Sequence, residues 1–497
     1  MKNDILISMK TRTLKQILLY NYRYWFGYSI IAFFGAYFLL WQINTIPPGL
    51  SQLELQAASS HTSLNGILSN PIYPLHSTLQ YLITSIFGAS SITIRIPSIL
   101  IAALSAYFIY SLMKKWFGKA TALLTTSILV SSDWFLYIAR HGTGAIEFSL
   151  WLAVALSCLT KLLEHKSKWL IVLSIALSGL LFAPLGIFIA GAIGITLFSV
   201  RVFRSRANEA ALWVKIFSVL IIILALSAAG FTSYHDSSFA KELIGVVNIP
   251  SIVDFPKNIF VNAAAIVAIL PGANPEISPT GVLVVRFFEL IFILFGIALM
   301  FKTRVNRLNL SVIIISIILV LVGGLLPNGW GFALLIVPAA IFMTAGMRHL
   351  MHRWRQTFPK NPYARIIAYL PLSVLFILIT LLHYNTYFEL WPSQTSTHTV
   401  FLPDYALLNN ELRNSSSSEN KCLVISENKA LKQLIFAQHT ICKPVFERGN
   451  SSLSSFDRII VQSGDSSNFI ETNKLTKNRA LVSNTKEDNV RWLIVKP

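Results

Sequence analysis

The chain has 497 residues, of which 54% are apolar and only 13% are charged, and it carries a formal net charge of +19. Soluble domains average about 25% charged residues, so this composition, with a mean hydropathy of +0.60, excludes an ordinary soluble protein and indicates a membrane protein. The positive charge gathers in alternate connections between apolar stretches, which is a topological pattern and no sign of a nucleic-acid partner.

Residues 1–24 form a basic head that is expected to lie in the cytoplasm. An apolar stretch at 25–44 follows it, without a small-residue cleavage site. Signal peptides have a shorter apolar core of about 7–15 residues, so the sequence predicts an uncleaved membrane anchor.

Apolar stretches of membrane-spanning length fill residues 25–386, which we predict to be one multi-span domain. Crossing a bilayer takes roughly 20 residues per helix, and unpaired backbone groups are too costly in hydrocarbon for an irregular chain. We expect spans near 25–44, 92–113, 120–139, 145–163, 169–183, 186–200, 212–232, 281–301, 310–326, 330–347 and 366–386. The predicted fold class is therefore an all-α polytopic membrane bundle of about 11 helices. The spans at 169–183 and 186–200 could instead form one re-entrant hairpin.

The distribution of lysine and arginine predicts the orientation of this bundle. Loops rich in these residues face the cytoplasm, which places the N-terminus inside and the C-terminal region outside. Two long loops, 42–91 and 233–280, then face outward, and we expect the working face there. The basic clusters comprise Lys2, Lys10, Arg12, Lys15 and Arg23; Lys114, Lys115 and Lys119; Lys161, Lys166 and Lys168; Arg201, Arg204, Arg206 and Lys215; Lys302, Arg304 and Arg307; and Arg348, Arg353, Arg355, Lys360 and Arg365.

Residues 387–497 are polar and are predicted to form a small soluble extracytoplasmic α/β domain. Apolar blocks of strand length lie at 422–425, 434–436, 458–461 and 492–495, and 429–438 is typical of a short helix. Cys422 and Cys442 are both expected on the oxidising side, where they could form a disulfide or remain two free thiols. Cys158 lies within a predicted span and is expected to be a small apolar filler.

Several motifs that define other classes of enzyme or transporter are missing from the chain. It has no GxxxxGK[ST], no GxGxxG, no HExxH and no paired CxxC. ATP-driven transport and the zinc chemistry of soluble enzymes therefore have no support in the sequence.

A series of short motifs resembles the first outer loops of the GT-C glycosyltransferases. The likeness is greatest to the dolichyl-phosphate-mannose-protein mannosyltransferases and the lipid A aminoarabinose transferases, whose first loop commonly reads Pro-Pro-Gly-Leu followed by a short spacer and Asp-Glu. The pieces occur in the expected order and topology over residues 40 to about 160. They are Pro47–Glu54, Asn70–Tyr73, Phe87–Gly88, Arg95–Ser98, Trp116–Gly118 and Tyr137–Arg140.

The resemblance implies transfer of a sugar, with inversion, from a polyprenyl-phosphate donor to a lipid, polymer or protein acceptor on the outer face. It implies that an acid of the first loop removes the acceptor's proton, and Glu54 is the candidate for this role. A solvated loop glutamate is the alternative. The departing phosphate needs cationic side chains or a metal ion to offset its charge.

The chain departs from the family pattern at two positions of this predicted site. Leu53 stands where the family usually has the Asp before the Glu, and Asn70 stands where relatives can carry a Lys that contacts the donor phosphate. Glu147 is a further acid expected near the substrate cavity, ranked below Glu54. Tyr73 could stack on the sugar or the isoprenoid, as could Trp134, although interfacial aromatic residues commonly serve only as anchors.

Three residues are predicted to bind the donor phosphate: Arg140, His141 and Arg286. Arg140 could also be an interfacial anchor. Arg286 could form a structural ion pair with Glu289, three residues on, because charges inside a membrane are costly and usually paired. Arg95 is expected to cap the helix that it begins, and Lys241 and Lys257 are weaker candidates.

We predict no cofactor. A divalent metal remains an alternative, because imidazole and carboxylate ligands suit Zn or Mn. The outward-facing candidates for its ligands are His61, His76, His141, His235, Glu54 and Asp236, but no pair of them has ligand spacing on a defined helix.

Two other functions stay open beside the glycosyltransferase. One is a transporter or flippase, which would be expected to show broken helices at corresponding positions in two halves, and no such internal symmetry is visible. The other is a non-catalytic membrane protein on a degenerate GT-C fold, suggested by Leu53 and Asn70.

Overall fold

The structure is a computed structural model. It describes residues 29, 32–245, 254–267, 285–303, 307–325, 330–357, 367 and 369–402, and four strands at 422–425, 458–462, 476–482 and 490–496. The predicted basic head at 1–24 and Cys442 lie outside the described residues.

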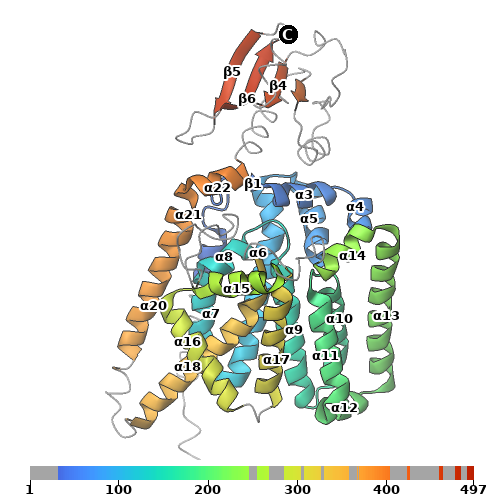
Figure 1. Ribbon diagram of the computed structural model, residues 1–497, viewed down its shortest axis with the longest axis vertical. Coiled ribbons are helices and arrows are strands. Elements are labelled where there is room, and N and C mark those ends of the chain that lie inside the picture. Colours follow the sequence, from blue (N-terminus) through green and yellow to red (C-terminus); the bar gives the residue numbers. More distant parts are fainter. Residues whose placement is uncertain are drawn as a thin grey trace, which may run out of the picture.

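The described chain is mainly a bundle of helices that run along the long axis of the molecule (Figure 1). Five helices are long and apolar enough to cross a membrane among the described residues, or up to seven if two bent pairs each count as one span. The helical elements are α3 (Gln52–Ser60), α4 (Leu64–Ser69), α5 (Pro74–Phe87), α6 (Ser91–Phe117), α7 (Lys119–Ser131), α8 (Asp133–Ala139), α9 (Ile146–Leu163), α10 (Trp169–Leu181), α11 (Gly186–Ser199), α12 (Arg201–Asn208), α13 (Leu212–His235), α14 (Ser237–Ile244), α15 (Asp254–Val267), α16 (Phe287–Lys302), α17 (Arg307–Gly323), η1 (Trp330–Leu335), α18 (Ile336–Thr357), α20 (Tyr369–Tyr384), η2 (Asn385–Leu390), α21 (Trp391–Ser393) and α22 (Thr395–Val400).

The chain is thus a multi-pass membrane protein, but the predicted number of about 11 spans is not confirmed. Most predicted apolar stretches do become helices, yet several are too short or too bent to count as spans by themselves. The stretch at 120–139 is divided into α7 and α8, whose axes differ by 65°. The break falls at Ser132, whose extended backbone (ψ 136°) ends one helix and precedes Asp133, the first residue of the next.

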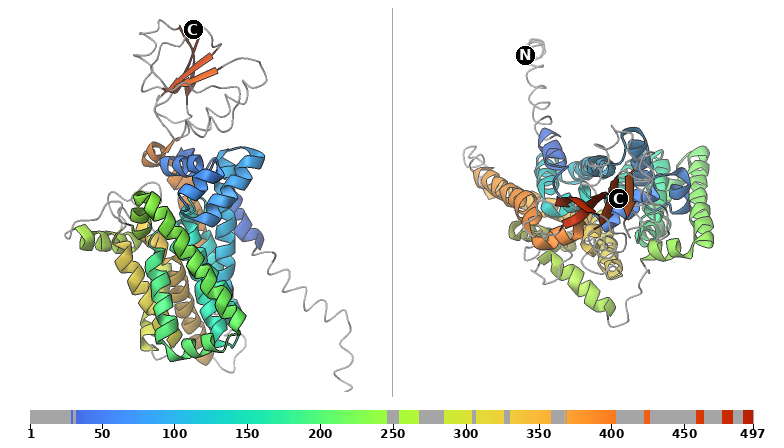
Figure 2. Two further views of the ribbon diagram at one scale, coloured as in Figure 1. Left: turned by 90° about the vertical axis from the view of Figure 1, so that its right-hand side faces the viewer. Right: turned by 90° about the horizontal axis from the view of Figure 1, so that it is seen from above.

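The two ends of the bundle differ in the helices and the charged residues that lie there. Figure 2 shows short helices gathered at one end, which carries α3, α4 and α5 and which we call the loop end. At the opposite end α12 turns by 82° from α11, with Phe203 buried and Arg201 and Arg204 exposed. This end also holds the Lys115–Glu164 ion pair, so basic clusters from separate loops gather there, as the positive-inside argument requires.

The helices α16 and α18 cross at very close range because glycines face each other at the contact. A Cβ atom built on Gly296 would lie 1.8 Å from the carbonyl oxygen of Phe342, and one on Gly346 would lie 2.3 Å from that of Phe292. Small residues allow this approach of backbones in membrane helices, where dispersion contacts hold helices together. The crossing places the beginning of α16, and with it Arg286, against the rest of the bundle.

Two small sheets complete the described structure. At the loop end, β1 (Leu50–Ser51) pairs antiparallel with β2 (Phe401–Leu402). The C-terminal residues form a four-stranded sheet of order β3-β4-β6-β5, with β3 (Cys422–Ile425) parallel to β4 (Arg458–Gln462) and the other pairs antiparallel. The predicted blocks at 422–425, 458–461 and 492–495 become β3, β4 and part of β6 (Val490–Lys496), whereas β5 (Thr476–Val482) was not predicted.

Other predictions for the C-terminal region fall on residues that the structure does not describe. The block at 434–436 and the helix at 429–438 lie there, as does Cys442, so an α/β domain and the Cys422–Cys442 disulfide stay predictions. Cys158, in contrast, is a free cysteine fully buried in α9, as expected of an apolar filler.

Candidate active site

The first loop contributes Glu54 to the candidate site from a capped helix, α3. Ser51 ends β1 and caps α3: its side chain accepts a hydrogen bond from the backbone N of Glu54 at 3.2 Å. The Glu54 carboxylate accepts one in return from the backbone N of Ser51 at 3.0 Å. This reciprocal capping box fixes the start of the helix, and it points the Glu54 side chain back into the protein.

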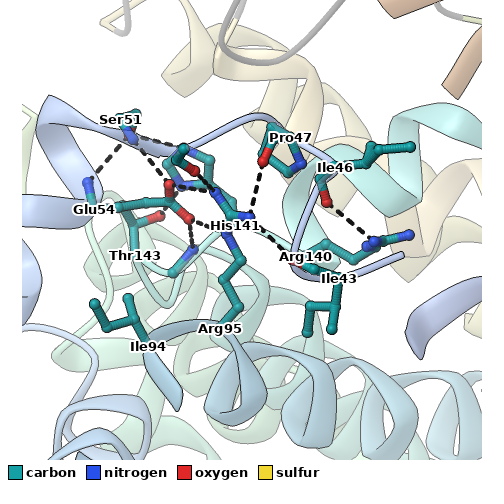
Figure 3. Close-up of polar contacts among 12 residues, drawn as sticks. Ile43, Ile46, Pro47, Ser51, Glu54, Ile94, Arg95, Arg140, His141 and Thr143 are labelled. Carbon is teal, nitrogen blue, oxygen red and sulfur yellow. Dashed lines mark hydrogen bonds and ion pairs between the residues drawn. The ribbon is translucent and has the colours of Figure 1, made fainter. Parts of the chain in front are cut away.

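Glu54 forms a two-point ion pair with Arg95 of α6 (Figure 3). Arg95 Nε lies 2.9 Å from Glu54 Oε1 and Nη2 lies 3.0 Å from Oε2, and both side chains are fully buried. The backbone N of Gly142 also donates to Oε1, at 2.8 Å. Arg95 further donates to the carbonyl oxygens of Pro47, at 3.1 Å, and of Gly49. The pair therefore joins the first loop, α6 and the loop after α8.

This geometry argues against the predicted role of Glu54 as the general base. A carboxylate has about four acceptor positions, and Glu54 already accepts four hydrogen bonds. Burial raises the pKa of its carboxyl, but Arg95, His141 and the hydrogen bond from Ser51 outweigh burial and lower the pKa to about 2. To act as a base, such a carboxylate must first give up one of these four hydrogen bonds.

Leu53 lies directly beside this buried pair but points outward. Its side chain is 42% exposed, although leucine gains by burial. Leu53 stands where the resembling family pattern has its aspartate, and in this chain that position is exposed, whereas Glu54 is buried in the ion pair.

The predicted phosphate ligands Arg140 and His141 are both buried. Arg140 donates to the carbonyl oxygens of Phe38 at 3.3 Å and Ile46 at 3.0 Å, and its guanidinium lies 5.1 Å from the ring centre of Tyr387. The ring of His141 lies between two hydroxyls, 3.3 Å from Ser51 Oγ and 2.9 Å from Thr143 Oγ1. Arg140 therefore joins backbone carbonyls and aromatic rings inside the protein, and His141 lies beside the cap of the helix that carries Glu54.

Glu147 caps a helix instead of facing a substrate. Its carboxylate accepts hydrogen bonds from the backbone N of Leu75 at 3.3 Å and of His76 at 2.9 Å, both in the first turn of α5. Trp151 Nε1 donates to it at 2.8 Å. A negative charge is favourable at a helix N-terminus, so this contact stabilises α5.

Tyr73 and Asn70 lie at the junctions around α5. Tyr73 precedes α5 in a left-handed backbone conformation (φ 51°), and its backbone N donates to the carbonyl oxygen of Phe182 at 3.1 Å. Asn70 ends α4 and keeps a buried Oδ1 that lacks a hydrogen-bond partner among the described residues. Lys241 and Lys257 are exposed.

A second group of charged side chains, which we call the Asp133 cluster, lies where α8, α16 and η2 meet. It consists of Asp133, Arg286, Glu289, His383 and Thr386. Arg286 Nη2 lies 2.7 Å from Asp133 Oδ2 and also donates to Thr386 Oγ1. His383 lies between the two acids, with Nδ1 3.1 Å from Asp133 Oδ1 and Nε2 3.1 Å from Glu289 Oε1.

This arrangement corrects the predicted side-chain pair of Arg286 and Glu289. The helix α16 begins at Phe287, so Arg286 is its capping residue and does not share a helical face with Glu289. Glu289 Oε2 accepts a hydrogen bond from the backbone N of Arg286 at 3.1 Å, while the guanidinium turns to Asp133.

The helix α8 and the π-helical segment η2 both run from the Asp133 cluster to Arg140. Asp133 begins α8 and Arg140 follows its end, a separation of roughly 10 Å for seven residues at 1.5 Å each. In η2, Thr386 contacts Arg286 and the next residue, Tyr387, lies against Arg140. The two clusters therefore share their supporting elements.

Residues 69–228 match a family model described as dolichyl-phosphate-mannose-protein mannosyltransferase. No curated protein sequence matches the chain. ArnT from Cupriavidus metallidurans bound to undecaprenyl phosphate aligns with a TM-score of 0.58 and 10% identity, over 94% of this chain and 96% of ArnT. The apo structure of the same protein aligns with a TM-score of 0.57 and 12% identity, over 94% of this chain and 98% of that chain. The structure of an Archaeoglobus fulgidus oligosaccharyltransferase in complex with Zn and sulfate aligns with a TM-score of 0.50 and 12% identity. The alignment covers 87% of this chain and 67% of that chain. The chain has the GT-C membrane fold.

In this GT-C bundle an apolar cavity of about 400 Å³ lies between α16, α17 and α18. Trp134 and Val285 line it, and they are the chain neighbours of Asp133 and Arg286. Other lining residues include Ile293, Ile297, Ile317 and Phe342. The cavity is lined almost entirely by apolar side chains, and two residues of its wall adjoin members of the Asp133 cluster in the chain. Trp134, expected to be a stacking residue, forms part of its wall.

Asp133 and His383 are site residues that sequence reasoning missed. Both lie inside predicted spans, at 120–139 and 366–386, where an ionisable residue is costly and commonly functional. The same argument singled out Arg286 and would have found them. Among the described residues, no group of three His, Cys, Asp or Glu side chains is arranged to hold a metal ion. His235 is exposed on α13, whereas His61 and His76 are buried near Glu54.

Proposed function

We propose that this protein is an integral-membrane glycosyltransferase that uses a polyprenyl-phosphate sugar donor. It would transfer the sugar, with inversion, to an acceptor at the loop end, on the extracytoplasmic side. The observation that carries the proposal is an apolar cavity whose wall includes Val285, the chain neighbour of Arg286. An isoprenoid tail fits an apolar channel at membrane depth, and a guanidinium at its end fits the phosphate.

Arg286 has the properties that the donor phosphate requires. Its side chain is 14% exposed, and its Nε is buried without a hydrogen-bond partner among the described residues. A leaving phosphate gains negative charge as the glycosidic bond breaks, and a fixed cation of this kind lowers the energy of that charge. Arg140, the other arginine expected to bind phosphate, also has a buried Nε without a partner among the described residues, but it is fully buried and its Nη1 and Nη2 donate to backbone carbonyls.

A turnover assay tests the proposed function. The purified full-length protein would be placed in vesicles with undecaprenyl-phosphate-linked sugars, and release of undecaprenyl phosphate would be measured with candidate acceptors from the cell envelope. We expect acceptor-dependent release that Arg286→Gln reduces at least about tenfold, while Lys119→Gln, at an exposed cation, leaves it unchanged. Absence of release with every donor and acceptor combination would reject the proposal.

A second candidate function is binding of a polyprenyl phosphate without sugar transfer. Leu53 at the position of the usual aspartate favours it, together with the four hydrogen bonds that occupy Glu54. Such a protein would bind undecaprenyl phosphate through the same cavity and Arg286 but would release no sugar. The two candidates therefore differ in turnover and agree in lipid binding.

A further inference from the structure

The anion-binding group of the proposed donor site is already occupied by an anion of the protein itself. Arg286 Nη2 lies 2.7 Å from Asp133 Oδ2, and Asp133 is almost completely buried. Arg286 has five N–H donors, and its hydrogen bonds to described side chains use only the Nη2 group. A phosphate bound to the Nε and Nη1 groups would share the positive charge of this guanidinium with Asp133.

The charges of the Asp133 cluster favour such a competition. Asp133 and Glu289 are two acids, against the one fixed positive charge of Arg286 and a second at His383 when its imidazole is protonated. A bound phosphate brings at least one more negative charge into a buried site, where unpaired charge is expensive. Of the two carboxylates only Asp133 contacts the guanidinium of Arg286, because Glu289 accepts from its backbone N.

We infer that Asp133 is an internal stand-in for the donor phosphate, released from Arg286 when the lipid-linked phosphate binds and retained by His383. This inference rests on the proposed function. Asp133 Oδ1 lies 3.1 Å from His383 Nδ1, so a protonated imidazole would keep the carboxylate when Oδ2 leaves Arg286. The backbone N of Asp133 lies 3.3 Å from the same nitrogen and can donate to it when that nitrogen is unprotonated, so the two residues stay in contact in either form. Asp133 is the first residue of the short helix α8, next to the break at Ser132, where a side chain can turn without disturbing a continuous helix.

The exchange gives Asp133 and His383 opposite effects on affinity. Asp133 competes with the phosphate for Arg286, so its removal strengthens phosphate binding. His383 receives the displaced carboxylate, so its removal weakens phosphate binding. If these residues merely held the fold together, loss of either would weaken binding.

The test measures the affinity of undecaprenyl phosphate for the purified full-length protein in lipid nanodiscs. We expect Asp133→Asn to bind severalfold more tightly than the wild type, His383→Gln to bind more weakly, and Arg286→Gln to bind at least about tenfold more weakly. In the double variant Asp133→Asn with Arg286→Gln, the gain from Asp133→Asn should vanish, because its competitor role needs Arg286. Glu209→Gln and Lys119→Gln, both at exposed positions, are the charge-matched controls.

Two further ligands test whether the change in affinity caused by Asp133→Asn depends on the phosphate and on the lipid tail. Undecaprenol has the same tail without phosphate, so its affinity should not respond to Asp133→Asn. Inorganic phosphate at the same concentration should bind negligibly, because it lacks the tail that fills the cavity. Equal gains for undecaprenol, or equal binding of inorganic phosphate, would overturn the assignment to a lipid-linked phosphate.

The exchange is also rejected if folded Asp133→Asn binds no more tightly than the wild type, or if its gain persists without Arg286. If Asp133→Asn does not fold, His383→Gln carries the test, and unchanged or tighter binding rejects the exchange. Failure of the proposed function is distinguishable, because it is judged by the absence of sugar release in the turnover assay and not by these affinities.

Discussion

Glu54 and Arg95, 41 residues apart in the chain, form a two-point ion pair in which neither side chain is exposed to solvent. Removing one partner of such a pair leaves a buried charge without compensation, which typically costs about 3–5 kcal/mol. The pair also holds the backbone of the first loop through Pro47 and Gly49. It is therefore a structural element at the base of the candidate site.

The first prediction concerns Glu54→Gln, which leaves the charge of Arg95 unpaired. We expect this variant to lose about 3–5 kcal/mol of stability, seen as a lower midpoint of thermal unfolding in detergent. Glu389→Gln, at an exposed carboxylate, is the control and should unfold like the wild type. A Glu54→Gln protein that unfolds normally and has lost only sugar transfer would instead restore Glu54 as the base.

The second prediction is the pH dependence that the low pKa of Glu54 imposes. The pKa is about 2 in the folded protein against 4.5 ordinarily, so the folded state binds this proton less readily than the unfolded state. The resulting stabilisation, about 3 kcal/mol, is fully present above pH 4.5 and is lost as the pH falls toward 2. The difference in unfolding free energy between wild type and Glu54→Gln should shrink over that interval. A difference independent of pH would contradict the ionised pair.

The third prediction concerns Leu53→Asp, which restores the aspartate of the family pattern at an exposed position. Because Leu53 is 42% exposed, the change should alter stability by less than about 0.5 kcal/mol. If the GT-C site lacks only its base, sugar transfer should rise at least about tenfold. Leu53→Asn, of similar size but unable to accept a proton, is the control. Equal activity of the two variants would show that position 53 supplies no base.

The fourth prediction concerns Arg140→Lys, which keeps the charge but loses the planar group. A lysine cannot hold both carbonyls, those of Phe38 and Ile46, while stacking beside Tyr387, so about 1–3 kcal/mol of stability should be lost. The KM for the lipid donor should stay unchanged, because Arg140 is fully buried and its Nη1 and Nη2 donate to backbone carbonyls. A raised KM with normal unfolding would return Arg140 to the phosphate site.

The fifth prediction concerns Gly296→Ala at the crossing of α16 and α18. The added methyl group would lie 1.8 Å from a backbone carbonyl, so the helices must separate and stability should fall by about 1–3 kcal/mol or more. Gly191→Ala is the matched control, since no atom lies within 4 Å of its added Cβ, and alanine there should be neutral or stabilising. Similar unfolding midpoints for the two variants would mean that the close crossing is not required.

The sequence predicted those features that depend on neighbouring residues. Apolar runs such as 92–113 and 145–163 predict α6 and α9 because the cost of unpaired backbone groups in hydrocarbon is a local constraint. The strand blocks at 422–425 and 458–461 are likewise visible as short apolar runs. The family resemblance, carried by short motifs in order, was confirmed by the match over 69–228 and by the fold.

The partners of the charged residues could not be predicted, because they come from distant parts of the chain. Arg286 pairs with Asp133, 153 positions away, and Glu54 pairs with Arg95 across the first loop. The spacing of Arg286 and Glu289 suggested a pair on one helix face, but that inference required the helix to begin before Arg286. The partner of a buried charge depends on where the helices begin and break. Those positions are set by the packing of distant parts of the chain.

The antiparallel pairing of Leu50–Ser51 with Phe401–Leu402 connects the first loop to the last described residues of the helical bundle. Ser51 is part of this strand pair and also caps α3, the helix that carries Glu54. Because Ser51 has both roles, a shift of β2 would act directly on the start of the helix that carries Glu54.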